Sequence, residues 1–193
     1  MAHVDDAAAL QNHDAIRAPH RAQAMGHDDA GAVQRLQMRL YAALGERMAR
    51  LDSGEAALYR SRTKSFLDRW NEAAARWQKQ GAPLKGVGVV VYHKNLSYLL
   101  NWLGMQEVGA LEPKPGLPPS TAHLNELLEQ LKRTPAKAVV RAAYNEPRAA
   151  EWLAERTKIL TITLPYTVGG TDAAKDLFSL YDDTLARLLA VAK

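Results

Sequence analysis

Apolar positions recur every three or four residues over two long stretches in the first part of the chain. The first stretch covers residues 32–51 and places its apolar residues at Val33, Leu36, Leu40, Leu44, Met48 and Leu51. The second runs to about residue 80, with stripe positions Tyr59, Thr63, Phe66, Trp70, Ala73 and Trp77. Such spacing predicts two amphipathic helices, the second of them long and packed against a bulky neighbour. Asp52, with Glu55 three residues further on, predicts a capping box between them.

After "GAPLKG" the pattern changes to short apolar runs that alternate with helical stretches. Strands are predicted at about 87–92, 107–111, 137–142 and 158–164, and helices at 94–103, 120–133, 147–156 and 173–191. Asp172 is a candidate N-cap of the last helix. Because the strands are mostly apolar on both faces, helices should cover both sides of a parallel sheet. The predicted fold class is therefore α/β: a four-stranded parallel sheet with helices on both faces, preceded by two helices that include a long one.

The chain divides into three segments by composition. Residues 1–31 have few large apolar residues, no persistent periodicity and four of the six histidines, His3, His13, His20 and His27. Such a segment buries too little surface to offset its ordering entropy, which predicts a disordered or irregular arm. Residues 32–82 form the helical segment, and residues 83–193 form the α/β lobe.

Composition excludes several classes of function. Cysteine is absent, which removes disulfides, thiolate metal sites and cysteine nucleophiles. The net charge of +4 is modest, and basic residues alternate with acidic ones, so we expect no nucleic-acid partner. The apolar runs are too short to span a bilayer, which argues against an integral membrane protein. No signal peptide is visible.

Candidate chemistry gathers where the predicted strands end. In a parallel sheet the ligand edge lies beyond the carboxyl ends of the strands. The residues that follow the strands include His93, Glu112, Tyr144, Glu146 and Asp172. A histidine at a strand end is either a ligand, an acid or base, or a hydrogen-bonded turn residue. Taken alone, each carboxylate also has an ordinary role as a loop charge or a helix cap.

Sharper catalytic motifs are missing from the sequence. "GVGVVV" precedes its strand, whereas a phosphate-binding loop must follow one, and "TVGGT" lacks a lysine partner. There is no G-x-S-x-G elbow and no H-E-x-x-H. His123 falls inside a predicted helix and is expected at the surface. The sequence therefore carries none of these catalytic signatures.

Three quoted stretches carry a family resemblance. The stretches "VVVYHKNLSYLLNWLG", "EPKPGLPPS" and "LPYTVGG" resemble the C-terminal lobe of the zinc/manganese-binding solute-binding proteins of ABC transporters. The long aromatic helix is similar to the backbone helix that joins the two lobes in that family. The resemblance runs from about residue 32 to the end of the chain. It implies a periplasmic protein, despite the lack of a visible signal peptide, that binds a divalent metal and delivers it to a permease.

Carried over residue by residue, His93 matches the family's histidine ligand from the C-terminal lobe. Many members place a carboxylate just after the last strand, where this chain has "LPYTVGG". Asp172 is the nearest carboxylate there, and Glu112 is a further candidate ligand. Imidazole suits zinc, and the lack of a well-placed carboxylate favours zinc over manganese.

The sequence departs from the family at its start. The resemblance implies an N-terminal lobe with two more histidine ligands, which we do not find; "QNHDAI" and "APHRAQ" echo only fragments of it. A truncated gene product is the favoured interpretation, and a half-receptor with a histidine-rich arm is the other. Two alternative functions stay open: a metal-dependent hydrolase, and an interaction module that binds no metal and docks through the aromatic stripe of residues 59–77.

Overall fold

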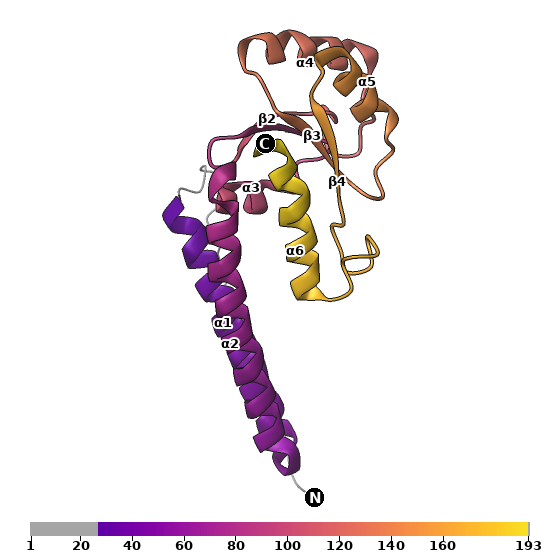
Figure 1. The fold of residues 1–193 in the computed structure, drawn as a ribbon. Coiled ribbons are helices and arrows are strands. Elements are labelled where there is room, and N and C mark those ends of the chain that lie inside the picture. The colour runs from indigo at the N-terminus through magenta and orange to yellow at the C-terminus, as the bar shows by residue number, and fades with distance from the viewer. Residues whose placement is uncertain (1–26, 193) are drawn as a thin grey trace, which may run out of the picture.

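The computed structural model describes residues 27–192, with side-chain surroundings from Met38 onward. The predicted arm falls mostly on residues 1–26, which lie outside the described residues. Two long helices, α1 (His27–Leu51) and α2 (Ala56–Gly81), come first and lie side by side (Figure 1). Helix α1 thus begins earlier than the predicted residue 32. Apolar periodicity reports only the packed part of a helix, whereas the backbone hydrogen bonds continue beyond it.

The junction between these helices differs from the predicted capping box. Ser53–Glu55 form a short 3₁₀ turn, and Asp52 makes no side-chain cap bond. Its carboxylate accepts a hydrogen bond from the Tyr59 hydroxyl at 3.3 Å. Helix α2 starts at Ala56 with Glu55 in the N-cap position, again without a side-chain cap bond. The short turn uses up the residues that a capping box would need.

The α/β part contains the predicted four-stranded parallel sheet. Its strands are β1 (Gly88–Val91), β2 (Gln106–Ala110), β3 (Ala138–Ala142) and β4 (Leu160–Leu164). They lie in the order β2-β1-β3-β4, and all three neighbouring pairs are parallel. The connecting helices are α3 (Ser97–Leu103), α4 (Thr121–Arg133) and α5 (Arg148–Thr157), and α6 (Leu177–Leu188) follows β4. The sequence-based fold class is confirmed.

Alternation along the strands distributes the core between two layers. Val89 and Val91 face one side of the sheet, in a cluster with residues of α2, α3 and α6. Val90 and Val139 face the other side, against α4 and α5. All four valines are fully buried. Burial on both faces explains why these strands read as continuous apolar runs.

The aromatic stripe of α2 is covered by α6 and α1. Trp77 is fully buried, stacks on Tyr181 of α6 with ring centroids 4.8 Å apart, and donates from Nε1 to Asp182 at 2.6 Å. Phe66, nearer the start of α2, stacks on Tyr41 of α1 at 4.4 Å. The bulky neighbour predicted for the long helix is therefore α6 over its second half. Beyond α6, the α1–α2 hairpin projects away from the sheet (Figure 1).

Candidate metal centre

The carboxyl ends of β1 and β2 bring an imidazole and a carboxylate into contact. Backbone bonds extend the pairing past the strands, because Glu112 N donates to Tyr92 O at 3.1 Å. This fixes the register in which His93 and Glu112 leave the sheet. Nδ1 of His93 and Oε2 of Glu112 lie 2.6 Å apart. Their side chains are 32% and 17% exposed, so the pair is shielded on most sides but open to an incoming ligand.

The contact leaves one ring nitrogen of His93 uncommitted. A carboxylate accepts hydrogen bonds, so in a neutral imidazole beside it Nδ1 carries the hydrogen and Nε2 the lone pair. No described residue hydrogen-bonds to Nε2. Metal-ligating histidines usually donate one ring N–H to a carboxylate and bind the metal through the other ring nitrogen. The contact of His93 Nδ1 with Glu112 has this form, with Nε2 left free.

Two tyrosines, Tyr144 and Tyr166, lie at the same edge of the sheet as His93 and Glu112. Asn95 donates to the Tyr144 hydroxyl at 3.2 Å, and the rings of Tyr144 and Tyr166 meet edge to face at 5.4 Å. Burial, then the neighbouring Tyr166 and Glu112, raises the pKa of the Tyr144 hydroxyl. Tyr166 has a left-handed backbone with φ of 64°, which is uncommon for a residue with a side chain. The sequence placed both tyrosines at this edge, because each follows the end of a predicted strand.

Tyr92 lies next to His93 in sequence but belongs to the α4–α5 side of the sheet, because successive strand residues alternate in direction. Burial, then the charges of Glu112 and Glu146, raises the pKa of its hydroxyl. Glu112 therefore contributes to the raised pKa of two hydroxyls, those of Tyr92 and Tyr144. Glu146 itself is exposed, and its Oε2 accepts the backbone N–H of Arg148 at 3.2 Å.

Asp172 lies in the loop between β4 and α6, and its side chain is exposed. It is not the N-cap of α6, as the sequence suggested. That position belongs to Asp176, which forms a reciprocal capping box with Ser179. Ala174, fully buried, holds the intervening segment in a loop because its carbonyl accepts the N–H of Gly169 at 2.7 Å. The loop thus continues four residues beyond Asp172 before the helix begins.

His123 was expected at the surface, and this expectation is wrong. Its ring is 24% exposed, and Nε2 lies 2.9 Å from the carbonyl oxygen of Ala110 at the end of β2. The histidine therefore ties α4 to the sheet. Among residues 27–192, no group of three or more histidine, aspartate or glutamate side chains is placed so as to hold a metal ion. The structure joins His93 with Glu112, and Asp172 does not complete such a group.

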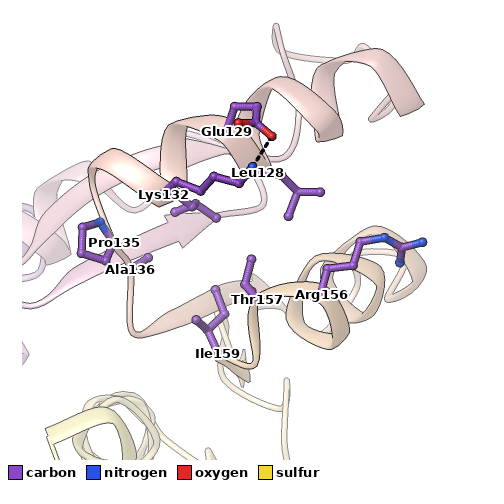
Figure 2. A pocket seen from close by; sticks show the side chains of 9 residues that line it. Leu128, Glu129, Lys132, Pro135, Ala136, Arg156, Thr157 and Ile159 are labelled. Atoms are coloured by element: carbon purple, nitrogen blue, oxygen red, sulfur yellow. Dashed lines mark hydrogen bonds and ion pairs between the residues drawn. The ribbon is translucent and has the colours of Figure 1, made fainter.

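A hollow of about 410 Å³ lies at the opposite edge of the sheet, between the ends of α4 and α5 (Figure 2). Leu128 and Ile159 contribute apolar surface there, and Glu129 is paired with Lys132 at 2.6 Å. Its lining residues include no histidine, and its one carboxylate is already paired. This hollow offers no donor set for a metal.

A family described as zinc-uptake complex component A, periplasmic (ZnuA), matches residues 35–191 of the chain. The chain is 22% identical over 122 residues to the high-affinity zinc uptake system protein ZnuA of Brucella abortus (strain 2308). That match covers 63% of this chain and 36% of the relative. The same match is found in Brucella suis biovar 1 (strain 1330). The chain therefore spans about a third of the length of these curated relatives.

Solved structures resemble the fold over most of the chain. A crystal structure of ZnuA is 19% identical, with a TM-score of 0.61, and covers 82% of this chain and 54% of its own. The Mn²⁺ complex of FpvC from Pseudomonas aeruginosa is 18% identical, with a TM-score of 0.59 over 78% and 56%. A Cd-bound periplasmic metal-binding protein from Candidatus Liberibacter asiaticus is 14% identical, with a TM-score of 0.64 over 81% and 60%. At these identities the likeness shows the fold.

Proposed function

The chain belongs to the zinc-uptake complex component A family, and from this premise we propose that it binds a divalent transition metal for delivery to an ABC transporter permease. Zinc is the proposed cargo, and the periplasm is the proposed compartment, because the family description carries both. Among the similar structures, one holds Mn²⁺ and another cadmium, so the proposal for zinc over manganese rests on this chain's own donors. No helix within residues 27–192 is long and apolar enough to cross a membrane.

The pair of His93 and Glu112 is the observation that carries the proposal. Nε2 of His93 is the proposed metal ligand, with metal–nitrogen bonds of about 2.0–2.1 Å for zinc. Glu112 is proposed to hold the imidazole by Nδ1, which fixes the tautomer and ring direction and raises the basicity of Nε2. This gives Glu112 a supporting role in addition to its role as a candidate ligand.

The nature of the donors supports zinc over manganese. Imidazole suits zinc, whereas carboxylate and water ligands suit manganese. Asp172 remains the candidate carboxylate of the loop after β4, and its exposed side chain would have to turn toward His93 on metal binding. The imidazole of His93 is in contrast already oriented by Glu112.

The two alternative functions find less support. A metal-dependent hydrolase needs several protein ligands, an open water position and a general base. Glu112 is the carboxylate next to His93, and it is already engaged with the ring. An interaction module would dock through the aromatic stripe of α2, yet Trp77 is fully buried under α6. Metal binding without catalysis is therefore the proposal.

Zinc titration of the full chain by calorimetry tests the proposal. The N-terminal histidines offer imidazoles of their own, so His3, His13, His20 and His27 are first replaced by asparagine in one background variant. In that background, His93→Ala should weaken zinc binding at least about tenfold. His123→Gln is the matched control, because its Nε2 is committed to the Ala110 carbonyl, and it should leave the affinity within about twofold.

Two results would contradict the assignment. Equal zinc affinities of the background variant and its His93→Ala derivative would remove His93 from the site. Complete loss of binding in the background variant itself would place the metal on the N-terminal histidines. Zinc binding by His93 should also weaken at acidic pH, because protons compete with the metal for the imidazole.

A further inference from the structure

A hollow of about 480 Å³ opens on the α4–α5 side of the sheet, where these two helices begin. Tyr92 lies in it beside the first turns of α4 and α5. His93 and Glu112 are not among its lining residues. The hollow is thus a neighbour of the proposed metal site and not a part of it. Its volume falls in the range of small-molecule pockets.

One wall of this hollow offers unpaired hydrogen-bond donors. Helix α5 starts after Pro147, which provides no side-chain cap bond. The N–H of Arg148 is taken by Glu146, but the N–H of Ala149 has no acceptor among the described residues. Ala149 and Arg148 both line the hollow, and Nε of Arg148, whose side chain is 91% exposed, lies 3.6 Å from Oε1 of Glu146. A helix start with a free N–H group and an exposed arginine nearby favours a negatively charged ligand, which competes with Glu146 for Arg148.

Tyr92 supplies a second, independent donor. Its side chain is only 9% exposed, and its hydroxyl makes no hydrogen bond with any described residue. Among the described residues, two side-chain atoms are fully buried without a hydrogen-bond partner, Trp70 Nε1 and Arg141 Nε. The Tyr92 hydroxyl is not one of them, so the oxygen itself is accessible although the residue is buried. It therefore reaches the hollow, where a ligand can accept its proton. Because the buried ring holds the Tyr92 hydroxyl in one position, the hydroxyl can donate to a ligand in only one direction.

The hollow also has an apolar wall. Pro119 precedes α4, Leu124 belongs to its first turn, and Trp152 lies one turn beyond Arg148 on α5. The Trp152 ring is fixed from behind by the Arg156 guanidinium, which lies 3.9 Å above its centroid. A flat or hydrocarbon body would gain contact area here without losing hydrogen bonds to water.

We propose that this hollow binds a small organic carboxylate with an apolar body. The carboxylate accepts hydrogen bonds from the Ala149 N–H and the Tyr92 hydroxyl and pairs with Arg148. The body lies against Pro119 and Trp152. The rim residue Glu146 opposes the ligand's charge and sets an upper limit on affinity. This site goes beyond the metal proposal and needs no metal.

Calorimetry on the full chain with 3-phenylpropionate as the probe tests this site, with the uncharged 3-phenylpropionamide and inorganic phosphate as comparison ligands. The acid should bind at least about tenfold more tightly than its amide, because charge-assisted bonds are the stronger ones. It should also bind more tightly than phosphate, which has no apolar body. Equal binding of the amide would overturn the carboxylate assignment, and equal binding of phosphate would overturn the role of the apolar wall.

Four variants locate the site. Arg148→Gln should weaken binding of the acid about two- to fivefold, and Glu146→Gln should strengthen it by a similar factor, as expected for exposed charges. Tyr92→Phe, which keeps the buried ring, should weaken binding about fivefold. Arg133→Gln, the same charge change on the exposed end of α4, is the matched control and should have no effect. If Arg148→Gln and Arg133→Gln behave alike, or if Glu146→Gln weakens binding, the proposal is wrong.

The metal proposal and the carboxylate proposal are tested separately, because they concern different residues. In the background variant, His93→Ala should weaken zinc binding at least about tenfold and leave 3-phenylpropionate binding within about twofold. Loss of acid binding in His93→Ala, with the fold intact by circular dichroism, would show that the hollow is not an independent site.

Discussion

Asp183 of α6 holds the loop after β4 in place, and its replacement by asparagine should destabilise the protein. Its carboxylate accepts the Thr171 hydroxyl at 2.6 Å and Nε of Arg187 at 2.9 Å. Arg187 in turn donates from Nη1 to the carbonyl oxygen of Thr163 in β4 at 3.2 Å. The Asp183 side chain is 11% exposed and that of Arg187 37%. One carboxylate thus connects loop, helix and strand.

The magnitude follows from which of these bonds survive in Asp183→Asn. A hydrogen bond to a buried charge is worth roughly 1.5–3 kcal/mol, and the neutral amide retains only part of it toward Thr171. Arg187 is exposed enough to recover water, so its ion pair adds less than about 1 kcal/mol. We expect a loss of about 2 kcal/mol in the free energy of unfolding. For a chain of this length that is a fall in Tm of about 4–8 °C.

The effect should depend on pH in one direction. Burial opposes ionisation of Asp183, but the hydrogen bonds from Thr171 and Arg187 outweigh it and lower its pKa below the usual value. A lowered pKa stabilises the fold above the unfolded value of about 3.9, and this contribution is lost as the pH falls through the folded pKa. The difference between wild type and Asp183→Asn should therefore be constant from pH 8 to pH 5 and shrink below about pH 4.

Urea unfolding followed by circular dichroism at several pH values measures this difference. Asp172→Asn is the matched control in the same loop, because its exposed side chain has no hydrogen-bond partner among the described residues. It should change the free energy of unfolding by less than about 0.5 kcal/mol. A deficit of Asp183→Asn below about 0.5 kcal/mol at pH 7, or one that persists unchanged at pH 3, would refute the argument.

Two further predictions concern the same edge of the sheet. Gly170→Ala should cost more than about 2 kcal/mol of stability in urea unfolding. Its Cβ would lie 1.8 Å from the carbonyl oxygen of Pro165, a backbone atom that cannot move aside. Gly54→Ala is the control and should be close to neutral, because the nearest atom to its Cβ is 3.7 Å away. Glu112→Gln should lower zinc affinity about 10- to 100-fold while His93 stays in place, as expected when an orienting carboxylate is lost, and an unchanged affinity in calorimetry would show that Glu112 does not support the ring.

Burial on both faces made the central strands β1 and β3 predictable from sequence. A strand such as Val89–Val91, buried on all sides, reads as an apolar run whatever its neighbours are. The same holds for α4, whose Leu124, Leu127 and Leu131 recur at helical spacing and are all buried. The apolar pattern was sufficient to predict these segments, because the burial of their residues repeats with the period of the strand or helix itself.

Local pattern failed where a contact between distant segments decides the outcome. The start of α6 was placed near Asp172 because that residue is a candidate N-cap, yet the burial of Ala174 keeps that segment in a loop. Only Asp176 has a partner, Ser179, for a reciprocal cap. His123 looked like a surface residue because the Ala110 carbonyl that it contacts comes from another element. Neither contact leaves a periodic signal in the sequence.

The candidate site lies between these two cases. Topology alone predicted that His93 and Glu112 leave the sheet at one edge, because β1 and β2 are parallel neighbours. It could not predict that Nδ1 and Oε2 meet at 2.6 Å, which depends on the register shift between Val89 and Val90. The contact changes the chemistry expected of Glu112, since a carboxylate that holds Nδ1 acts on the metal through the imidazole.

This arrangement also sets what the described residues can contribute to metal capture. A zinc site takes three or four protein ligands, whereas within residues 27–192 His93 has only Glu112 beside it and no third donor. In the proposed site, one oriented imidazole would fix where a metal sits but not how tightly it is held. Tight capture by His93 would therefore require donors that lie outside these residues or move toward the edge, and release would require only that those donors withdraw. A metal carrier benefits from such a division, because the oriented imidazole can keep its place while affinity is switched by the other donors.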